Sequence, residues 1–208
     1  MALQMAGDET DAQRAATRGL ALAEALDHPN TLAHALHNIA IGHQLAGDRD
    51  AVHAAASRGA ALVQKFGLTQ WRANCLLHTA WANAVGDGIA DAARLVDAEI
   101  VSATASGPLP QYFIGLAAEV LLGAGRAADA LAHLDRAIAG IDEPGVGFYV
   151  PEIYRLRGEC LLALDRNNKN EARQAFVAAR EIADRQGAVI FADRAQASLA
   201  ELANIGIG

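Results

Sequence analysis

Hydrophobic positions along this chain recur every three or four residues rather than in alternation. Between residues 115 and 137 they form two short blocks, separated by a Gly-Ala-Gly break. The first block carries Leu116 and Leu121, and the second carries Ala130 and Leu134. This spacing is typical of an amphipathic helix that buries one face. The stretch therefore predicts two short helices joined by a tight turn.

The same pattern continues through the whole chain. Helices are predicted at residues 10–26, 31–46, 50–66, 69–85, 89–105, 115–123, 127–137, 152–164, 171–186 and 189–203. Gly67 and Gly187 stand where a helix ends, because glycine adopts the left-handed conformation of a C-terminal cap without strain. The strongest break is the proline-rich linker at residues 106–110. No stretch alternates as a strand would, so the fold class is predicted to be all-α.

The predicted turns are evenly spaced. They lie near Gly7, Gly47, Gly86, Gly125 and Asp165, at intervals of 39 or 40 residues. Helix pairs with small residues at their contact are similar to the tetratricopeptide (TPR) repeat, whose usual period is about 34 residues. We expect one domain over residues 1–208, a right-handed TPR-like superhelical solenoid with the first helix of each pair on the concave face. The chain opens within a repeat, as expected of a fragment of a larger protein.

Four runs of residues carry a more specific resemblance, at residues 20–48, 71–86, 110–138 and 154–164. They resemble the C-terminal helical array of large bacterial signalling proteins that carry a class III adenylate or guanylate cyclase domain and an ATPase domain. They are also similar to the array of maltose-regulator-type transcriptional activators. The resemblance implies a regulatory region that senses or recruits something and leaves the cyclase reaction to another part of the parent protein.

Composition narrows the possible partners. The net charge is −7 and only two lysines occur, so a nucleic-acid-binding surface and adhesion to an acidic membrane are not expected. No signal-peptide pattern opens the chain, and the longest uncharged run, residues 100–118, is interrupted by two prolines. Cys75 and Cys160 lie far apart within helical patterns, which favours buried free thiols. We expect a cytoplasmic location.

Motifs for catalysis are missing from the sequence. There is no G-K-[ST], G-x-S-x-G, H-E-x-x-H or C-x-x-C motif, and the two Gly-x-Gly pairs are turn residues. His34 and His37 lie one turn apart, with His43 and His53 further along, but no carboxylate or cysteine stands at ligand spacing. We therefore expect no enzyme activity, no cofactor and no metal.

The predicted concave face carries polar and aromatic residues of the kind that bind a peptide. These are His34, His37, Gln44, Asn83, Tyr112, Glu119, Glu152, Arg155 and Glu159. The alternative interpretation is an ordinary solvated helix face. Arg155 is the leading candidate, because carboxylates flank its guanidinium group. Trp71 and Trp81 are expected to pack between helices.

These observations favour a non-catalytic module that binds a protein segment, or the parent's own catalytic domains, in the concave groove. The first alternative is a sensor of a small ligand, as the maltose-regulator resemblance implies. The second is an oligomerisation arm that associates through the apolar helices at its two ends, residues 10–26 and 189–203.

Overall fold

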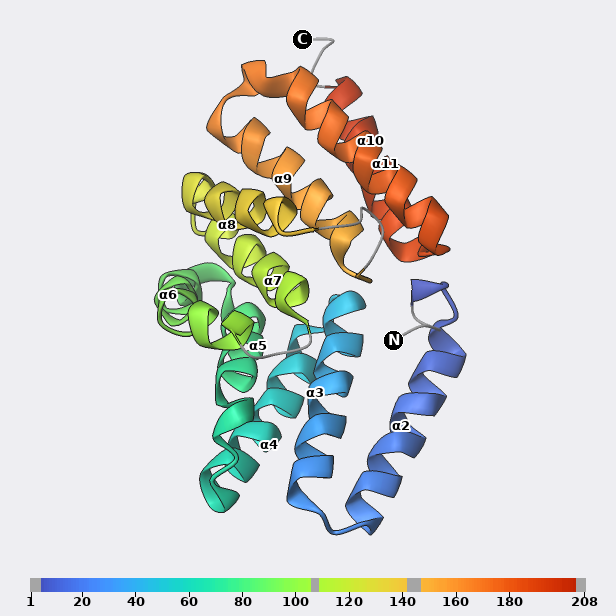
Figure 1. Cartoon of the computed structure of the whole chain (residues 1–208), viewed down its shortest axis with the longest axis vertical. Coiled ribbons are helices and arrows are strands. Elements are labelled where there is room, and N and C mark those ends of the chain that lie inside the picture. Colours follow the sequence, from blue (N-terminus) through green and yellow to red (C-terminus); the bar gives the residue numbers. More distant parts are fainter. Residues whose placement is uncertain (1–4, 106–108, 142–146, 205–208) are drawn as a thin grey trace. The chain divides into compact units, whose positions relative to one another are not determined.

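The computed structural model describes residues 5–105, 109–141 and 147–204, which form ten α-helices and no strand (Figure 1). The helices are α2 (Glu9–Ala25), α3 (Pro29–Leu45), α4 (Arg49–Phe66), α5 (Arg72–Asn83), α6 (Ile89–Ala105), α7 (Pro110–Gly123), α8 (Ala127–Ala139), α9 (Val150–Leu164), α10 (Lys169–Gln186) and α11 (Val189–Asn204). The prediction of an all-α chain is confirmed.

The helices fall into two compact units. The first comprises Asp8–Ala103, and the second comprises Met5–Gly7 with the chain from Thr104 onward. In the first unit α3 packs on α2 and α4, and α4 also packs on α5. In the second unit α9 packs on α7, α8, α10 and α11. Neighbours in sequence are therefore neighbours in space, as in a helical repeat. Across the described ranges, no helix combines the length and the apolar character needed to cross a membrane.

A left-handed residue follows three helices at matching positions of the repeat. α2, α4 and α10 are followed by Asp27, Gly67 and Gly187, whose φ angles are 47°, 68° and 64°. Asp27 and Gly67 lie 40 residues apart, which is one repeat length. Gly67 and Gly187 lie 120 residues apart, which is three repeat lengths. A left-handed residue satisfies the last helical carbonyl groups and reverses the chain. The period seen in the sequence thus corresponds to a recurring backbone conformation.

Two helices, α5 and α7, start at other residues than predicted. Residues Thr69–Trp71 form a 3-10 turn and α5 begins only at Arg72. α7 begins at Pro110, because proline fits the first turn of a helix, where its missing N–H is not needed. Asp165 caps another 3-10 turn, Arg166–Asn168, its carboxylate accepting from the backbone N–H of Asn167 at 2.8 Å. Part of the linker at residues 106–110 and most of the loop expected at 142–150 lie outside the described residues.

Glycines allow two close contacts in the second unit. A Cβ atom on Gly158 of α9 would lie 2.3 Å from the Phe176 ring of α10, and one on Gly115 of α7 would lie 2.3 Å from the Tyr149 ring. Both aromatic rings are fully buried. Helix α9 can therefore approach α10 only because position 158 has no side chain.

This contact gives a testable expectation. Gly158→Ala should lower the free energy of unfolding by about 1–3 kcal/mol, because the new methyl group overpacks the core. Gly19→Ala on α2 is the matched control, since no atom lies within 4 Å of a Cβ built there. Alanine favours the helix more than glycine does, so we expect this control to raise the free energy of unfolding by about 0.5–1 kcal/mol. Urea denaturation of both variants measures the difference, and equal effects would contradict this account of α9 packing.

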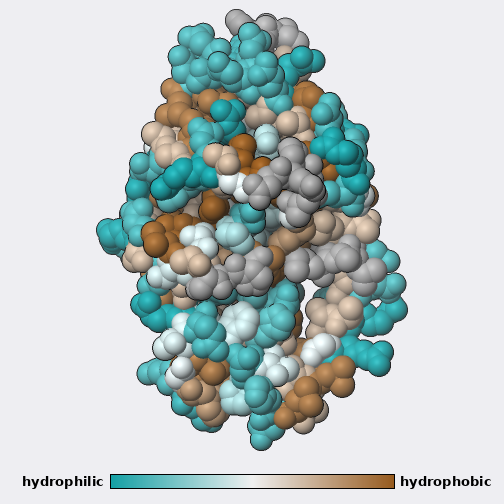
Figure 2. Space-filling model, in the orientation of Figure 1, coloured by the Kyte–Doolittle hydropathy of each residue, from teal (hydrophilic) through white to brown (hydrophobic). Residues whose placement is uncertain are grey.

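On the face that Figure 2 shows, hydrophilic side chains are widespread, with hydrophobic ones between them. The two end helices both expose apolar side chains. Leu22 of α2 is 57% accessible, and Leu26, directly after this helix, is 66% accessible. α11 exposes Val189 but also Asp193, Gln196 and Glu201. α2 also exposes Gln13, Arg14 and Arg18, so both end helices present charged side chains beside apolar ones, and self-association through them stays a prediction.

Candidate binding site

The nine residues predicted to line a groove are divided between the two units. His34, His37, Gln44 and Asn83 belong to the first, and Tyr112, Glu119, Glu152, Arg155 and Glu159 to the second. Each unit brings some of its members together. Gln44 is buried, and Asn83 is exposed at the end of α5.

The second unit holds a network of charged side chains centred on α9. Glu152, Arg155 and Glu159 lie three and four residues apart, so they share one face of the helix. Arg155 Nη2 donates to Glu152 Oε1 at 2.7 Å, and Nη1 donates to Glu159 Oε1 at 3.2 Å. Glu152 is only 1% exposed. One guanidinium group therefore joins two carboxylates, one of them fully buried.

Helices α7 and α11 complete the network. Arg194 of α11 donates through Nη1 to Glu152 Oε1 at 3.2 Å. One turn further along α11, Ser198 Oγ donates to Glu159 Oε1 at 2.7 Å. The Tyr149 hydroxyl, just before α9, donates to Glu119 Oε1 of α7 at 3.1 Å. Three helices thus contribute polar groups to one site, and Glu119 acts on Arg155 through its charge.

The charges in this network are stabilised by one another. Burial raises the pKa of the Glu152 carboxyl, but the charges and hydrogen bonds of Arg155 and Arg194 outweigh burial and hold that pKa below its usual value. Burial lowers the pKa of the Arg155 guanidinium, and Glu152, Glu159 and Glu119 together raise it above its usual value. Glu152 is therefore an ionised carboxylate in the interior.

Two buried atoms of the network lack hydrogen-bond partners within the described residues. They are Glu152 Oε2 and Arg155 Nε. A buried polar atom without a partner costs about 1–3 kcal/mol, more when it belongs to a charged group. At the edge of the network, the side chains of Arg155, Glu159 and Arg194 remain 17%, 28% and 29% exposed. The interior of the site therefore contains polar atoms without hydrogen-bond partners in the described residues. Arg155, Glu159 and Arg194 form its partly exposed rim.

Aromatic rings lie beside the charges. Tyr112 of α7 packs edge-on against Tyr149, with ring centroids 5.1 Å apart, and Tyr149 packs in the same way on Phe191 at 5.5 Å. Burial, followed by the Glu119 charge, raises the pKa of both tyrosines. Tyr112 is fully buried, so it supports the site from below instead of lining a groove.

The first unit holds a separate cluster of histidine and tryptophan rings. His34 and His37 of α3 each lie 5.5 Å from Trp71, measured between ring centroids, and His37 lies 5.3 Å from His78 of α5. Burial and the neighbouring imidazole lower the pKa of His37 to about 4 and that of His78 to about 3. Trp71 is half-buried, and its indole N–H donates to Asn30 Oδ1 at 2.7 Å.

Sequence reasoning missed several residues of these clusters, among them Tyr149, Arg194, Ser198 and His78. A usable signal existed for two of them. Arg194 follows Arg155 by 39 residues, and Ser198 follows Glu159 by the same interval, which is one repeat. The period marks which positions of successive helices lie side by side. His78 carried no such signal, because it reads as an ordinary position on a buried helix.

Metal binding and thiol chemistry depend on the histidine, cysteine and acidic side chains. In the part of the chain that the structure describes, no group of three or more His, Cys, Asp or Glu side chains could hold a metal ion. Burial raises the pKa of the Cys75 thiol to about 11 and that of Cys160 to about 12. Both cysteines therefore remain thiols near neutral pH, and the more nucleophilic thiolate form is scarce.

Comparison with protein-family models, with curated protein sequences and with solved structures gives no match to this chain.

Proposed function

We propose that this chain is a non-catalytic interaction module, built as a TPR-like solenoid, that binds a segment of a partner protein. The recurring left-handed helix ends and the contacts between consecutive helices support the solenoid. In this arrangement α7, α9 and α11 are equivalent first helices of successive repeats. The binding surface is the face where their polar side chains meet.

The observation that carries this proposal is the incompletely satisfied charge network around Glu152 and Arg155. Buried ion pairs are costly to desolvate and contribute little net stability, so a packed apolar cluster would serve the fold as well. Perturbed pKa values cluster at functional sites, and the exposed rim makes this network accessible to a partner protein. A partner segment would supply hydrogen-bonding groups to the rim residues Arg155, Glu159 and Arg194.

Other features agree with a binding role. The two cysteines keep their protons, and His37 and His78 are buried as neutral rings. In the cyclase-type arrangement that the sequence resembles, the bound segment would come from the parent's own catalytic domains. The chain would then regulate a reaction that it does not perform.

The proposal predicts that rim variants lose the partner while the fold is kept. We expect Glu159→Gln and Arg194→Gln to reduce the amount of partner captured from source-cell extract about tenfold, the effect of about 1.4 kcal/mol in binding. Arg180→Gln is the matched control, because Arg180 lies on α10 and pairs with Asp184 at 3.0 Å. Equal capture by all four proteins, with melting temperatures within a few degrees, would rule out this face.

A further inference from the structure

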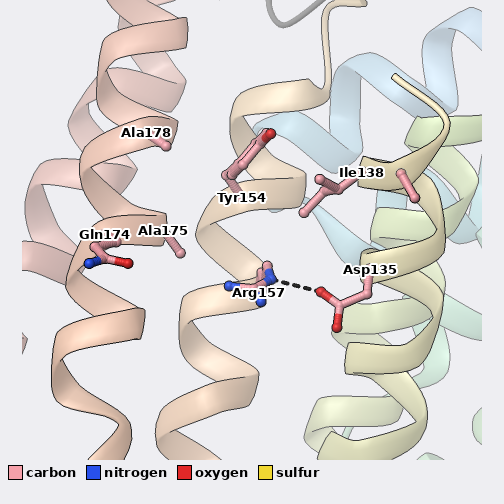
Figure 3. A pocket seen from close by; sticks show the side chains of 8 residues that line it. Asp135, Ile138, Tyr154, Arg157, Gln174, Ala175 and Ala178 are labelled. Carbon is pink, nitrogen blue, oxygen red and sulfur yellow. Dashed lines mark hydrogen bonds and ion pairs between the residues drawn. The ribbon is translucent and has the colours of Figure 1, made fainter. Parts of the chain in front are cut away.

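A groove runs between α8 and α10 of the second unit, with α9 as its floor (Figure 3). Its volume is about 480 Å³. Its lining includes Asp135 and Ile138 from α8, Tyr154 and Arg157 from α9, and Gln174 and Ala178 from α10. Tyr154 and Arg157 lie on the face of α9 opposite Glu152 and Arg155, given 3.6 residues per helical turn. The groove is therefore separate from the proposed partner site.

The repeat shows why this groove is open. α4 and α10 follow one template, 120 residues apart, and Ala55 and Ala175 are buried at matching positions. In the first unit Arg58 of α4 reaches across to α2 and donates to Glu24 Oε1 at 2.7 Å. The position that matches Arg58 in α10 is Ala178, whose methyl group lines the groove. The bridging side chain of the first unit is thus replaced by empty space in the second.

Hydrogen-bonding groups in the groove remain available. Arg157 Nε donates to Asp135 Oδ1 at 2.7 Å, as Figure 3 shows. Within the described ranges, the two terminal nitrogens of Arg157 make no hydrogen bond, nor do the Tyr154 hydroxyl and the Gln174 amide. Asp135, the acidic side chain of the lining, is already engaged by Arg157. The free donors therefore exceed the free anionic acceptors.

The charge around the groove also differs from that of the whole chain. The three helices that line it, α8, α9 and α10, carry seven basic and seven acidic residues together and are neutral, whereas the chain has a net charge of −7. A guanidinium group with free terminal N–H groups favours a carboxylate, which can accept two parallel hydrogen bonds. Ile138 and Ala178 offer apolar surface beside it. The lining is therefore complementary to an aliphatic chain that ends in a carboxylate.

We propose that this groove binds an acidic segment of a partner protein, with a glutamate carboxylate on Arg157 and neighbouring aliphatic side chains on Ile138 and Ala178. The Tyr154 hydroxyl and the Gln174 amide supply further hydrogen bonds to the bound segment. This site is independent of the charge network on the other face of α9.

The test uses the full chain and defined probes. Two blocked pentapeptides, Ala-Leu-Glu-Leu-Ala and its glutamine counterpart, and free hexanoate are titrated against the ¹⁵N-labelled protein by NMR. We expect the glutamate peptide to shift the Arg157 Nε–H resonance and the backbone amides of α9 and α10 around the groove. The glutamine peptide should bind at least tenfold more weakly. The Arg157→Gln variant should lose the response, and Arg180→Gln should keep it.

Several results would overturn the proposal. These are no shift at millimolar peptide, equal affinity for the glutamine peptide, or an unchanged response in Arg157→Gln. Binding of hexanoate without binding of the peptide would also overturn it, because the occupant would then be a small acid. Failure of this experiment would not contradict the proposed partner site at the charge network, because none of the probes depends on Glu159 or Arg194.

Discussion

Replacing Arg155 with methionine is expected to lower the free energy of unfolding by about 3–5 kcal/mol, the usual cost of removing one partner of a buried ion pair. The change leaves Glu152, which is 1% exposed, with only the 3.2 Å contact from Arg194. It also removes the hydrogen bond to Glu159. Chemical denaturation at pH 7 with urea measures the loss.

Two controls separate charge from packing. The double variant Glu152→Gln, Arg155→Met should recover much of the loss, because no uncompensated charge then remains in the interior. Arg58→Met removes an exposed pair with Glu24, whose partners are 50% and 47% accessible, and should cost less than about 1 kcal/mol. A loss for Arg155→Met no larger than that for Arg58→Met would show that Glu152 is not left as an uncompensated charge in the interior.

Acidification is expected to destabilise the chain well before its carboxylates titrate. His37 and His78 have pKa values of about 4 and about 3 in the folded state, against 6.5 when unfolded. Because the pKa of each histidine is lower in the folded state, the unfolded chain binds more protons as the pH falls. The contribution of these histidines to stability is therefore fully present above pH 6.5 and is lost as the pH falls toward 4. With two such histidines, we expect the free energy of unfolding to fall by roughly 2–4 kcal/mol between pH 7 and pH 5.

The matched control is the double variant His37→Gln, His78→Gln. It should show a much flatter dependence of unfolding free energy on pH over the same range, whatever its absolute stability. Glu152 contributes in the same direction, but only below its ordinary value of 4.5, so measurements from pH 5 to pH 7 isolate the histidines. A wild-type profile as flat as that of the double variant would mean that the two rings are not buried together.

Much of the fold could be predicted because local signals determine it. Helical periodicity and the glycines at positions 67 and 187 gave the number and order of the helices. The starts of α5 and α7 were misplaced, because a 3-10 turn at Thr69–Trp71 and a proline at the head of α7 decide them.

The candidate site was predictable only along one helix. The spacing of Glu152, Arg155 and Glu159 placed them on one face from sequence alone. That Glu152 is buried, and that Arg194 reaches it from α11, depends on tertiary packing. Tyr112 was expected to line a groove but is fully buried beneath the charges, because its ring packs on Tyr149.

The central claim is that a partner segment binds to the face of α7, α9 and α11, and site-specific photo-crosslinking tests it most directly. A benzophenone amino acid at Ala163 lies one turn beyond Glu159 on the same face of α9, and both Ala163 and the control position Ala128 on α8 are exposed. We expect a covalent adduct with the partner from position 163, its loss when Arg194→Gln is added, and none from position 128. Equal adducts from both positions, or adducts from position 128 alone, would contradict the assignment of this face as the binding surface.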